Sequence, residues 1–113
     1  MVLLRGEKIH VVYRRLFERD LRKHFVGEVE EYENGIVRAS GHIFVIEDPK
    51  ENVFRRKPEK RTRIIPLNAS PLYINVLPAT VDLNSVRYES KGRDLRVTDG
   101  SDWYLDIKEF GWA

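Results

Sequence analysis

The sequence predicts a mainly β fold: a small, strongly bent sheet or barrel built on a central hairpin, with at most one N-terminal helix. Three observations predict it. Asn34-Gly35, a dipeptide suited to the two positive-φ positions of a type I′ turn, separates two long runs of strand-forming residues. Short strand-like runs punctuated by turn residues fill the second half of the chain. Gly27 and Gly41 interrupt the hairpin strands where a bulge or a sharp bend fits.

Composition narrows the class of protein. The 113 residues predict a single domain, 1–113, and 42% hydrophobic with 34% charged residues suits a folded chain. The absence of cysteine excludes disulfides, thiol nucleophiles and cysteine metal sites. The N-terminal residues resemble no signal peptide and no apolar run has membrane-spanning length, so we expect a cytoplasmic protein without membrane contact. A net charge of +2 predicts no global attraction to polyanions.

The central hairpin, residues 25–47, has a register set by its two-residue loop. Continued without interruption, this register gives the pairs Glu33–Ile36, Glu31–Arg38, Val29–Ser40, Gly27–His42 and Phe25–Phe44 on one face and Tyr32–Val37, Val26–Ile43 and His24–Val45 on the other. The two glycines then fall at adjacent levels, so both strands can bend together, as a small barrel or a strongly coiled sheet requires.

Residues 8–24 allow two interpretations. Apolar side chains recur at helical spacing, at Ile9, Val12, Tyr13, Leu16, Phe17 and Leu21. The run Ile9–Tyr13 is instead rich in β-branched and aromatic residues, which favours a strand followed by a turn at 18–20. The helix accounts for more positions, and the strand is the alternative.

Further short elements follow the hairpin. The strand-like runs cover 53–55, 63–67, 72–77, 86–89, 95–98 and 103–107, with a turn or a single helical turn at 79–84. The last three runs have the spacing of a β meander.

One segment is unusually basic. The candidate residues for binding a polyanion such as RNA are Arg55, Arg56, Lys57, Lys60 and Arg61, with Arg63 close behind. A phosphate backbone is neutralised by such a cluster, and its binding weakens as salt rises. The alternative is a solvated loop between strands, which Pro58 fits equally well.

The C-terminus carries a second candidate surface. Trp103, Phe110 and Trp112 form an aromatic group that either closes the core or anchors an interface with a second copy of the chain. This group makes a homo-oligomer our expectation.

Catalytic and metal-binding signatures are missing from the sequence. His10, His24 and His42 have no metal-ligand spacing, and the predicted register places His24 and His42 on opposite faces. There is no nucleophile elbow, P-loop or dinucleotide fingerprint. We therefore expect no catalytic residues, no metal and no cofactor, and a protein that is not an enzyme.

The outline from Lys8 to Pro78, an amphipathic segment followed by a long bent hairpin and a short strand at 72–77, resembles the Sm-like small barrels. The resemblance implies barrel architecture, oligomeric rings and RNA binding. The RNA-binding motifs of that family are not matched: Tyr32-Glu33-Asn34-Gly35 replaces its Asp-x-x-x-Asn element, and residues 73–76 lack its Arg-Gly pair. No RNA-binding residue of the family is carried over. The prediction is a binding or assembly module, by RNA or polyanion binding through the basic segment or, alternatively, by self-association.

Overall fold

The computed structural model describes residues 3–13, 22–46, 54–68, 72–91 and 94–106. Within these ranges the elements are β1 (Lys8–Tyr13), β2 (Lys23–Glu33), β3 (Ile36–Ile46), β4 (Phe54–Arg56), β5 (Arg61–Pro66), β6 (Leu72–Leu77), the 3-10 turn η1 (Leu83–Ser85), β7 (Arg87–Lys91), β8 (Asp94–Thr98) and β9 (Tyr104–Asp106). The prediction of a mainly β fold is confirmed. No helix in these ranges has the length and apolar character needed to cross a membrane.

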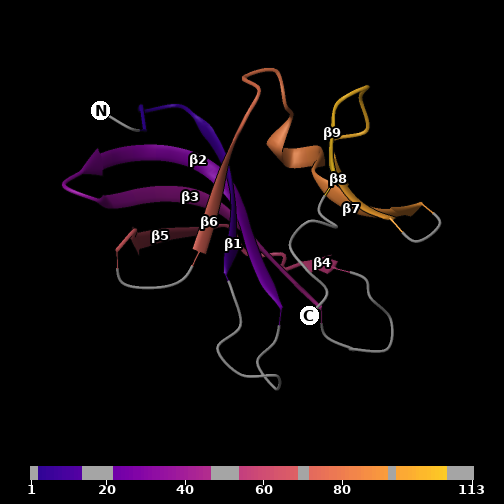
Figure 1. Ribbon diagram of the computed structural model, residues 1–113, viewed down its shortest axis with the longest axis horizontal. Coiled ribbons are helices and arrows are strands. Elements are labelled where there is room, and N and C mark those ends of the chain that lie inside the picture. The colour runs from indigo at the N-terminus through magenta and orange to yellow at the C-terminus, as the bar shows by residue number, and fades with distance from the viewer. Residues whose placement is uncertain (1–2, 14–21, 47–53, 69–71, 92–93, 107–113) are drawn as a thin grey trace.

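The strands form two antiparallel sheets (Figure 1). The larger has the order β4-β3-β2-β1-β6, with β5 also paired to β3, and the smaller is the meander β7-β8-β9. Figure 1 shows the meander beside the larger sheet, with η1 between them. Among the described strands β5 pairs with β3 and β6 with β1, so the larger sheet stays open. Of the two predicted forms, the bent sheet is correct and the closed barrel is not.

The turn between β2 and β3 has the predicted conformation. Asn34 has a φ of 48° and Gly35 a φ of 79°, as a type I′ turn requires. Glu31 lies opposite Arg38 and Tyr32 opposite Val37, as the sequence predicts.

Beyond this point the predicted register is wrong by one residue. A β-bulge at Glu30 makes Val29 pair with Ala39, and it therefore brings Phe25 opposite Ile43 and His24 opposite Phe44. The physical reason lies in the core, because Val29 and Tyr32 both pack into the same hydrophobic cluster. Residues three apart in a regular strand point to opposite faces, and one extra residue brings them to the same face.

The bend in the hairpin lies where Gly27 and Gly41 stand directly opposite each other. A Cβ built on Gly41 would lie against the carbonyl oxygen of Val26 and 2.5 Å from the Cα of Gly27, and one built on Gly27 would lie against the carbonyl oxygen of Ser40. No side chain fits at such distances, so this close crossing of β2 and β3 requires glycine in both strands.

The N-terminal segment is a strand over Lys8–Tyr13, so the helical interpretation is wrong there and the strand alternative is confirmed. β1 pairs with β2 on one side and β6 on the other, and both of its faces are buried. A strand apolar on both faces has a nearly continuous hydrophobic run, which also satisfies helical spacing. Residues 14–21, including the predicted turn at 18–20, lie outside the described residues.

The larger sheet buries a different core on each face. We call the face that carries His10, His24 and Phe44 the meander face, because its apolar residues pack with those of the three-stranded sheet. That core consists of Val26, Phe44, Phe54, Leu77, Val81, Val86, Tyr88, Leu95 and Val97. The opposite face has its own core of Leu3, Ile9, Val11, Phe25, Val29, Val37, Ala39, Ile43, Val45 and Ile65.

Residues 78–86 connect the two sheets. The ammonium group of Lys8 in β1 donates to the carbonyl oxygen of Ala79 at 2.7 Å and also to that of Val81. Val81 and Val86 are buried in the core between the sheets. This connection therefore holds the meander against the face that carries His10 and His24.

Candidate functional site

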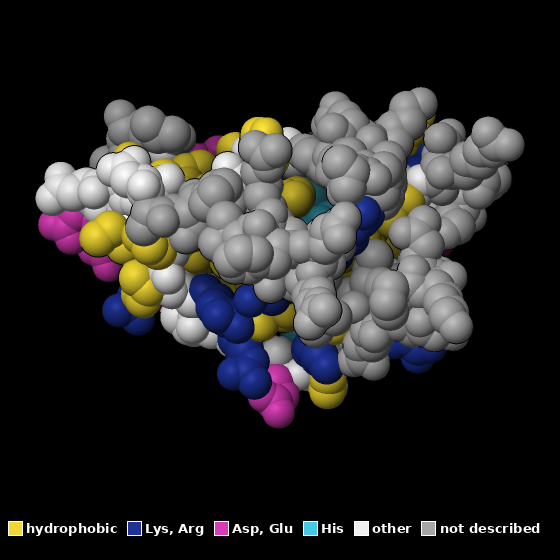
Figure 2. Space-filling view, turned by 60° about the horizontal axis from the view of Figure 1, so that its bottom comes forward, with side chains coloured by type: hydrophobic (Ala, Val, Ile, Leu, Met, Phe, Trp, Pro, Cys, Tyr) yellow, Lys and Arg dark blue, Asp and Glu magenta, His cyan; other side chains and the backbone are white. Residues whose placement is uncertain are grey.

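The predicted basic residues lie along one edge of the larger sheet, in β4, in β5 and in the connection between them. We call this surface the basic edge; its members are Arg55, Arg56, Lys57, Lys60, Arg61 and Arg63. The first five side chains are exposed and Arg63 is half-buried. Figure 2 shows Lys and Arg side chains gathered in the lower middle of the face that it presents.

A single long strand, β3, supports the whole basic edge. Its C-terminal half pairs with β4, where Phe44 lies opposite Arg56, and its N-terminal half pairs with β5, where Gly41 lies opposite Arg61. Phe54, with 6% of its surface exposed, anchors β4 in the core between the sheets. The cations are thus carried on paired backbone at both ends, with only residues 57–60 connecting the two strands.

The charge of the edge is strongly one-sided. Residues 54–66 contain six cations and one carboxylate, a net charge of +5, whereas the whole chain has a net charge of +2. The carboxylate, Glu59, lies 2.8 Å from a guanidinium nitrogen of Arg61, and an exposed pair of this kind adds little stability. Arg56 donates to the backbone carbonyl of Asn84 at 2.9 Å, which fixes its guanidinium beside η1.

His42 lies on β3 beside this edge and is half-buried. Burial lowers the pKa of its imidazole, and the positive charges of Arg56 and Lys60 lower it further. The positive charges of both side chains therefore act on the imidazole of His42.

The prediction that His24 and His42 lie on opposite faces of the hairpin is wrong. The bulge at Glu30 places both on the meander face, because His24 pairs with Phe44, two residues from His42.

The predicted aromatic surface is only partly described. Trp103 is half-buried and packs against the core between the sheets, and its carbonyl accepts a hydrogen bond from Thr98 Oγ1 at 2.7 Å. Phe110 and Trp112 lie outside the described residues, so the aromatic interface stays a prediction.

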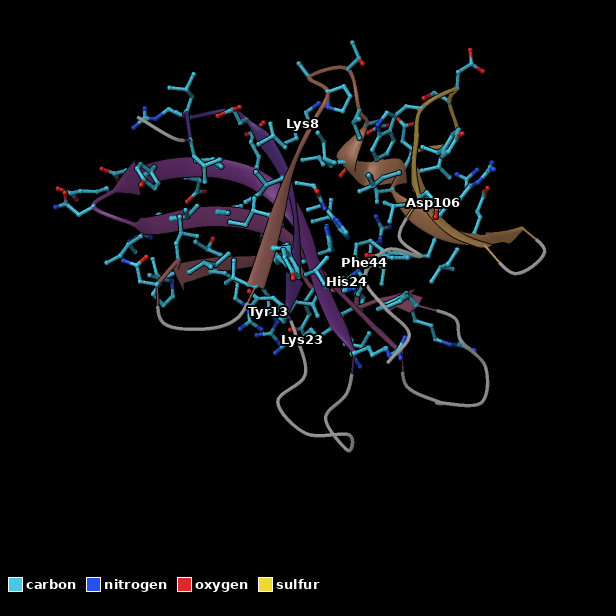
Figure 3. All side chains as sticks on the ribbon, viewed as in Figure 1. Lys8, Tyr13, Lys23, His24, Phe44 and Asp106 are labelled. Atoms are coloured by element: carbon cyan, nitrogen blue, oxygen red, sulfur yellow. The ribbon has the colours of Figure 1, made fainter. Side chains whose placement is uncertain are left out.

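Sequence reasoning missed a buried polar cluster between the two sheets. His10 in β1 has 0% of its surface exposed, His24 in β2 has 5% and Tyr88 in β7 has 9%. His10 Nε2 lies 3.1 Å from His24 Nδ1 and 3.0 Å from the Tyr88 hydroxyl, and that hydroxyl lies 2.5 Å from His24 Nδ1. Figure 3 shows His24 beside Phe44, in the region between the sheets. We call these three residues the buried histidine–tyrosine cluster.

A hydrogen bond from Asn75 determines which ring nitrogen of His10 carries the proton. The side-chain nitrogen of Asn75 lies 3.2 Å from His10 Nδ1 and donates to it, which leaves the proton of a neutral His10 on Nε2. The His10 Nε2 proton then faces both the Tyr88 oxygen and His24 Nδ1, and the Tyr88 hydroxyl donates to His24 Nδ1. One directed chain of hydrogen bonds therefore links β6, β1, β7 and β2.

Electrostatics keeps this cluster neutral. Burial lowers the pKa of His10 to about 4. Burial lowers the pKa of His24 more strongly, with smaller contributions from His10 and Arg22, and it raises the pKa of Tyr88. Phe54 packs on both His24 and Tyr88, at 4.4 Å between ring centroids. A neutral, buried cluster of this kind holds the two sheets together.

In the described part of the chain, no three His, Asp or Glu side chains lie together as metal ligands would. The ring nitrogens of the buried cluster that face Tyr88 and Asn75 are used in hydrogen bonds. The one signal for this cluster in the sequence is a histidine within each of two strongly apolar strands, because a buried polar side chain needs a polar partner.

Comparisons with protein-family models, with curated proteins and with solved structures found no match. The resemblance to Sm-like barrels is therefore not supported by a family match.

Proposed function

We propose that the protein is a cytoplasmic, non-enzymatic binding module that binds RNA through the phosphates along its basic edge. The observation that carries the proposal is the concentration of exposed cations on one supported edge, with a net charge of +5 over residues 54–66. The residues that contact phosphate are Arg55, Arg56, Lys57, Lys60 and Arg61.

The chemistry of these residues suits phosphate. Three of the five are arginines, whose guanidinium groups bind phosphate oxygens in pairs, and the two lysines add compact charges. Five phosphate contacts on a single strand give a slope of about −3.5 for log K against log salt concentration. Affinity then falls about 100-fold between 50 and 200 mM salt.

The same surface favours phosphate over bases. The only aromatic residue of segment 54–66 is Phe54, and it is buried in the core. Reading bases in single strands depends largely on exposed aromatic side chains on which they stack. We therefore expect binding with little dependence on sequence.

The test is fluorescence anisotropy with a labelled single-stranded RNA of twelve uridines at 50, 100 and 200 mM salt. We expect binding at 50 mM, the salt slope given above, and loss of binding when all five cations are changed to glutamate. Lys60→Glu is compared with Arg87→Glu, an equal charge change on the meander, and only the first should weaken binding markedly. The absence of binding at 50 mM salt, or binding that survives the fivefold reversal, would refute the proposal.

Self-association is the second candidate function, favoured by two exposed apolar side chains on the outermost strands of the larger sheet. Ile64 on β5 and Val76 on β6 have 55% and 53% of their surfaces exposed. Among the described residues each strand pairs along one side only, so a second copy has free backbone to pair with. Sedimentation velocity at 10 to 500 μM protein tests this, and a monomer throughout would exclude it.

A further inference from the structure

We propose that His42 is a further phosphate contact of the basic edge, and that RNA binding is coupled to the uptake of one proton by its imidazole. This inference rests on the proposed function and deepens it, because it adds a titratable residue to the binding surface. It predicts that the affinity for RNA depends on pH near neutrality, which a surface of only arginine and lysine would not show.

The position of His42 in the sheet is the first argument. β4 pairs with β3 from Phe44 onwards and β5 pairs with β3 up to Gly41, so His42 lies where one partner strand ends and the other begins. Continued by one residue, the pairing of Gly41 with Arg61 brings Lys60 opposite His42. Cations therefore flank the imidazole from both strands of the basic edge.

The shared face is the second argument. Residues opposite each other in antiparallel strands point to the same face, and so do residues two apart in one strand. Arg56 is opposite Phe44 and so lies on the meander face together with His42. The register therefore brings His42, Arg56 and Lys60 to one face of the sheet, near enough for both positive charges to act on the imidazole. A phosphate bound there would contact all three side chains.

Within the described part of the sheet, the β2 residues that lie opposite His42 and its two chain neighbours carry no negative charge. Across the sheet, β2 places the apolar Val26 opposite His42, and His24, which is neutral and buried, lies opposite Phe44. The nearest carboxylate on β2 is Glu28, opposite Ser40 and exposed. In the connection between β4 and β5, Glu59 is bonded to Arg61.

Charge couples the binding of RNA to the protonation of His42. In the free protein the imidazole is partly buried beside two cations, and both effects lower the pKa of His42. A phosphate placed among these groups reverses the sign of the local field and accepts a hydrogen bond from the imidazolium. The proton comes from solvent and binds an imidazole nitrogen; no covalent bond forms or breaks. Because linkage is reciprocal, lowering the pH must tighten binding.

The size of the effect is bounded by one proton, which gives at most a tenfold change in Kd per pH unit. We expect Kd for the twelve-uridine RNA to fall about tenfold in total between pH 8.0 and pH 5.5 at constant ionic strength. The phosphodiester does not titrate in this range. His10 and His24 do not face the basic edge, so their protonation adds no phosphate contact.

The experiment measures Kd by anisotropy at pH 5.5, 6.0, 6.5, 7.0 and 8.0, at 50 mM ionic strength, for the wild type, His42→Gln and His42→Arg. Circular dichroism at each pH verifies that each variant is folded. We expect the wild type to bind more tightly as pH falls, His42→Gln to bind with the affinity of the wild type at pH 8.0 throughout, and His42→Arg to bind tightly at every pH. NMR of the imidazole Cε1 proton measures the pKa of His42 directly and should show it rising when RNA is added.

The outcomes separate the two proposals. Binding with the same Kd at every pH, or an unchanged pH dependence in His42→Gln, would overturn the role of His42 and leave RNA binding by the basic edge intact. No binding by the folded wild type at pH 8.0 and 50 mM ionic strength would overturn the proposed function, and the role of His42 with it.

Discussion

Acid should weaken the fold through the buried histidine–tyrosine cluster well before it protonates most carboxylates. In the unfolded chain each histidine titrates near 6.5, whereas in the folded protein burial lowers the pKa of His10 to about 4 and that of His24 further. Below pH 6.5 the unfolded state therefore binds more protons than the folded state. The stability that comes from burying His10 and His24 in their neutral forms is complete above pH 6.5, and it is lost as the pH falls through and below that value.

The loss in the free energy of unfolding depends on how far the pH lies below 6.5, the pKa of histidine in the unfolded chain. At pH 5.0 both folded-state values lie lower, so each histidine costs about 1.4 kcal/mol for each of 1.5 pH units, or about 2 kcal/mol. The two together cost about 4 kcal/mol, a large part of the 5 to 15 kcal/mol typical of a domain. Asp99, whose carboxylate accepts hydrogen bonds from Ser101 and from the backbone of Asp82, has a lowered pKa and titrates below this window.

The assay is urea unfolding followed by circular dichroism at pH 7.5, 6.5, 5.5 and 5.0. His24→Gln removes one titrating group but retains an acceptor for Tyr88, so the loss between pH 7.5 and 5.0 should fall by about half. His42→Gln serves as the control, because this half-exposed histidine should contribute much less. A free energy of unfolding that is constant from pH 7.5 to 5.0, or an unchanged pH dependence in His24→Gln, would refute the reasoning.

Three substitutions test the glycines of the hairpin and the hydroxyl of the buried histidine–tyrosine cluster. Gly41→Ala should destabilise the fold by about 1–3 kcal/mol or more, because the new Cβ would lie against backbone atoms of β2, and thermal unfolding measures it. Tyr88→Phe should cost about 1–3 kcal/mol because it removes the hydroxyl that hydrogen-bonds both buried imidazoles, whereas Tyr104→Phe on the exposed side of the meander should cost little. Equal effects of the two substitutions would contradict this role for the hydroxyl. Gly35→Ala should cost about 1 kcal/mol because residue 35 has a φ of 79°, and an unchanged midpoint in urea would count against that assignment.

The local features of the fold could be read from the sequence because they depend on neighbouring residues. Asn34-Gly35 determined its own turn, and the run Leu72–Leu77 matched β6 residue for residue. The register beyond Glu30 could not be read in the same way. Phe25 and Val26 are buried on opposite faces, so alternation there carried no information about which residue faces which core. The spacing of Val29 and Tyr32, three residues apart and facing one core, was the available sign of the bulge.

The candidate sites were predictable to different degrees. The basic edge lies within one short segment of the sequence, residues 55–63, so composition alone was sufficient to find it. The buried histidine–tyrosine cluster draws on β1, β2 and β7, and Tyr88 lies 64 residues from His24. Such a cluster follows only from the correct register and from the packing of one sheet on another, neither of which a single sequence provides.

The division of one side of β3 between two short strands should also limit the addition of further chains to this edge. A long, flat and apolar outermost strand is a template on which further chains can add, and natural sheets suppress this with charge, proline and interruption. β4 and β5 combine all three, since β5 begins with Arg61 and ends with Pro66, Pro58 lies between the two strands, and no strand covers residues 57–60. Replacing the cations by alanine would therefore remove a protection against aggregation as well as the proposed phosphate contacts. Reversing the charges keeps the edge charged and is the sharper test of RNA binding.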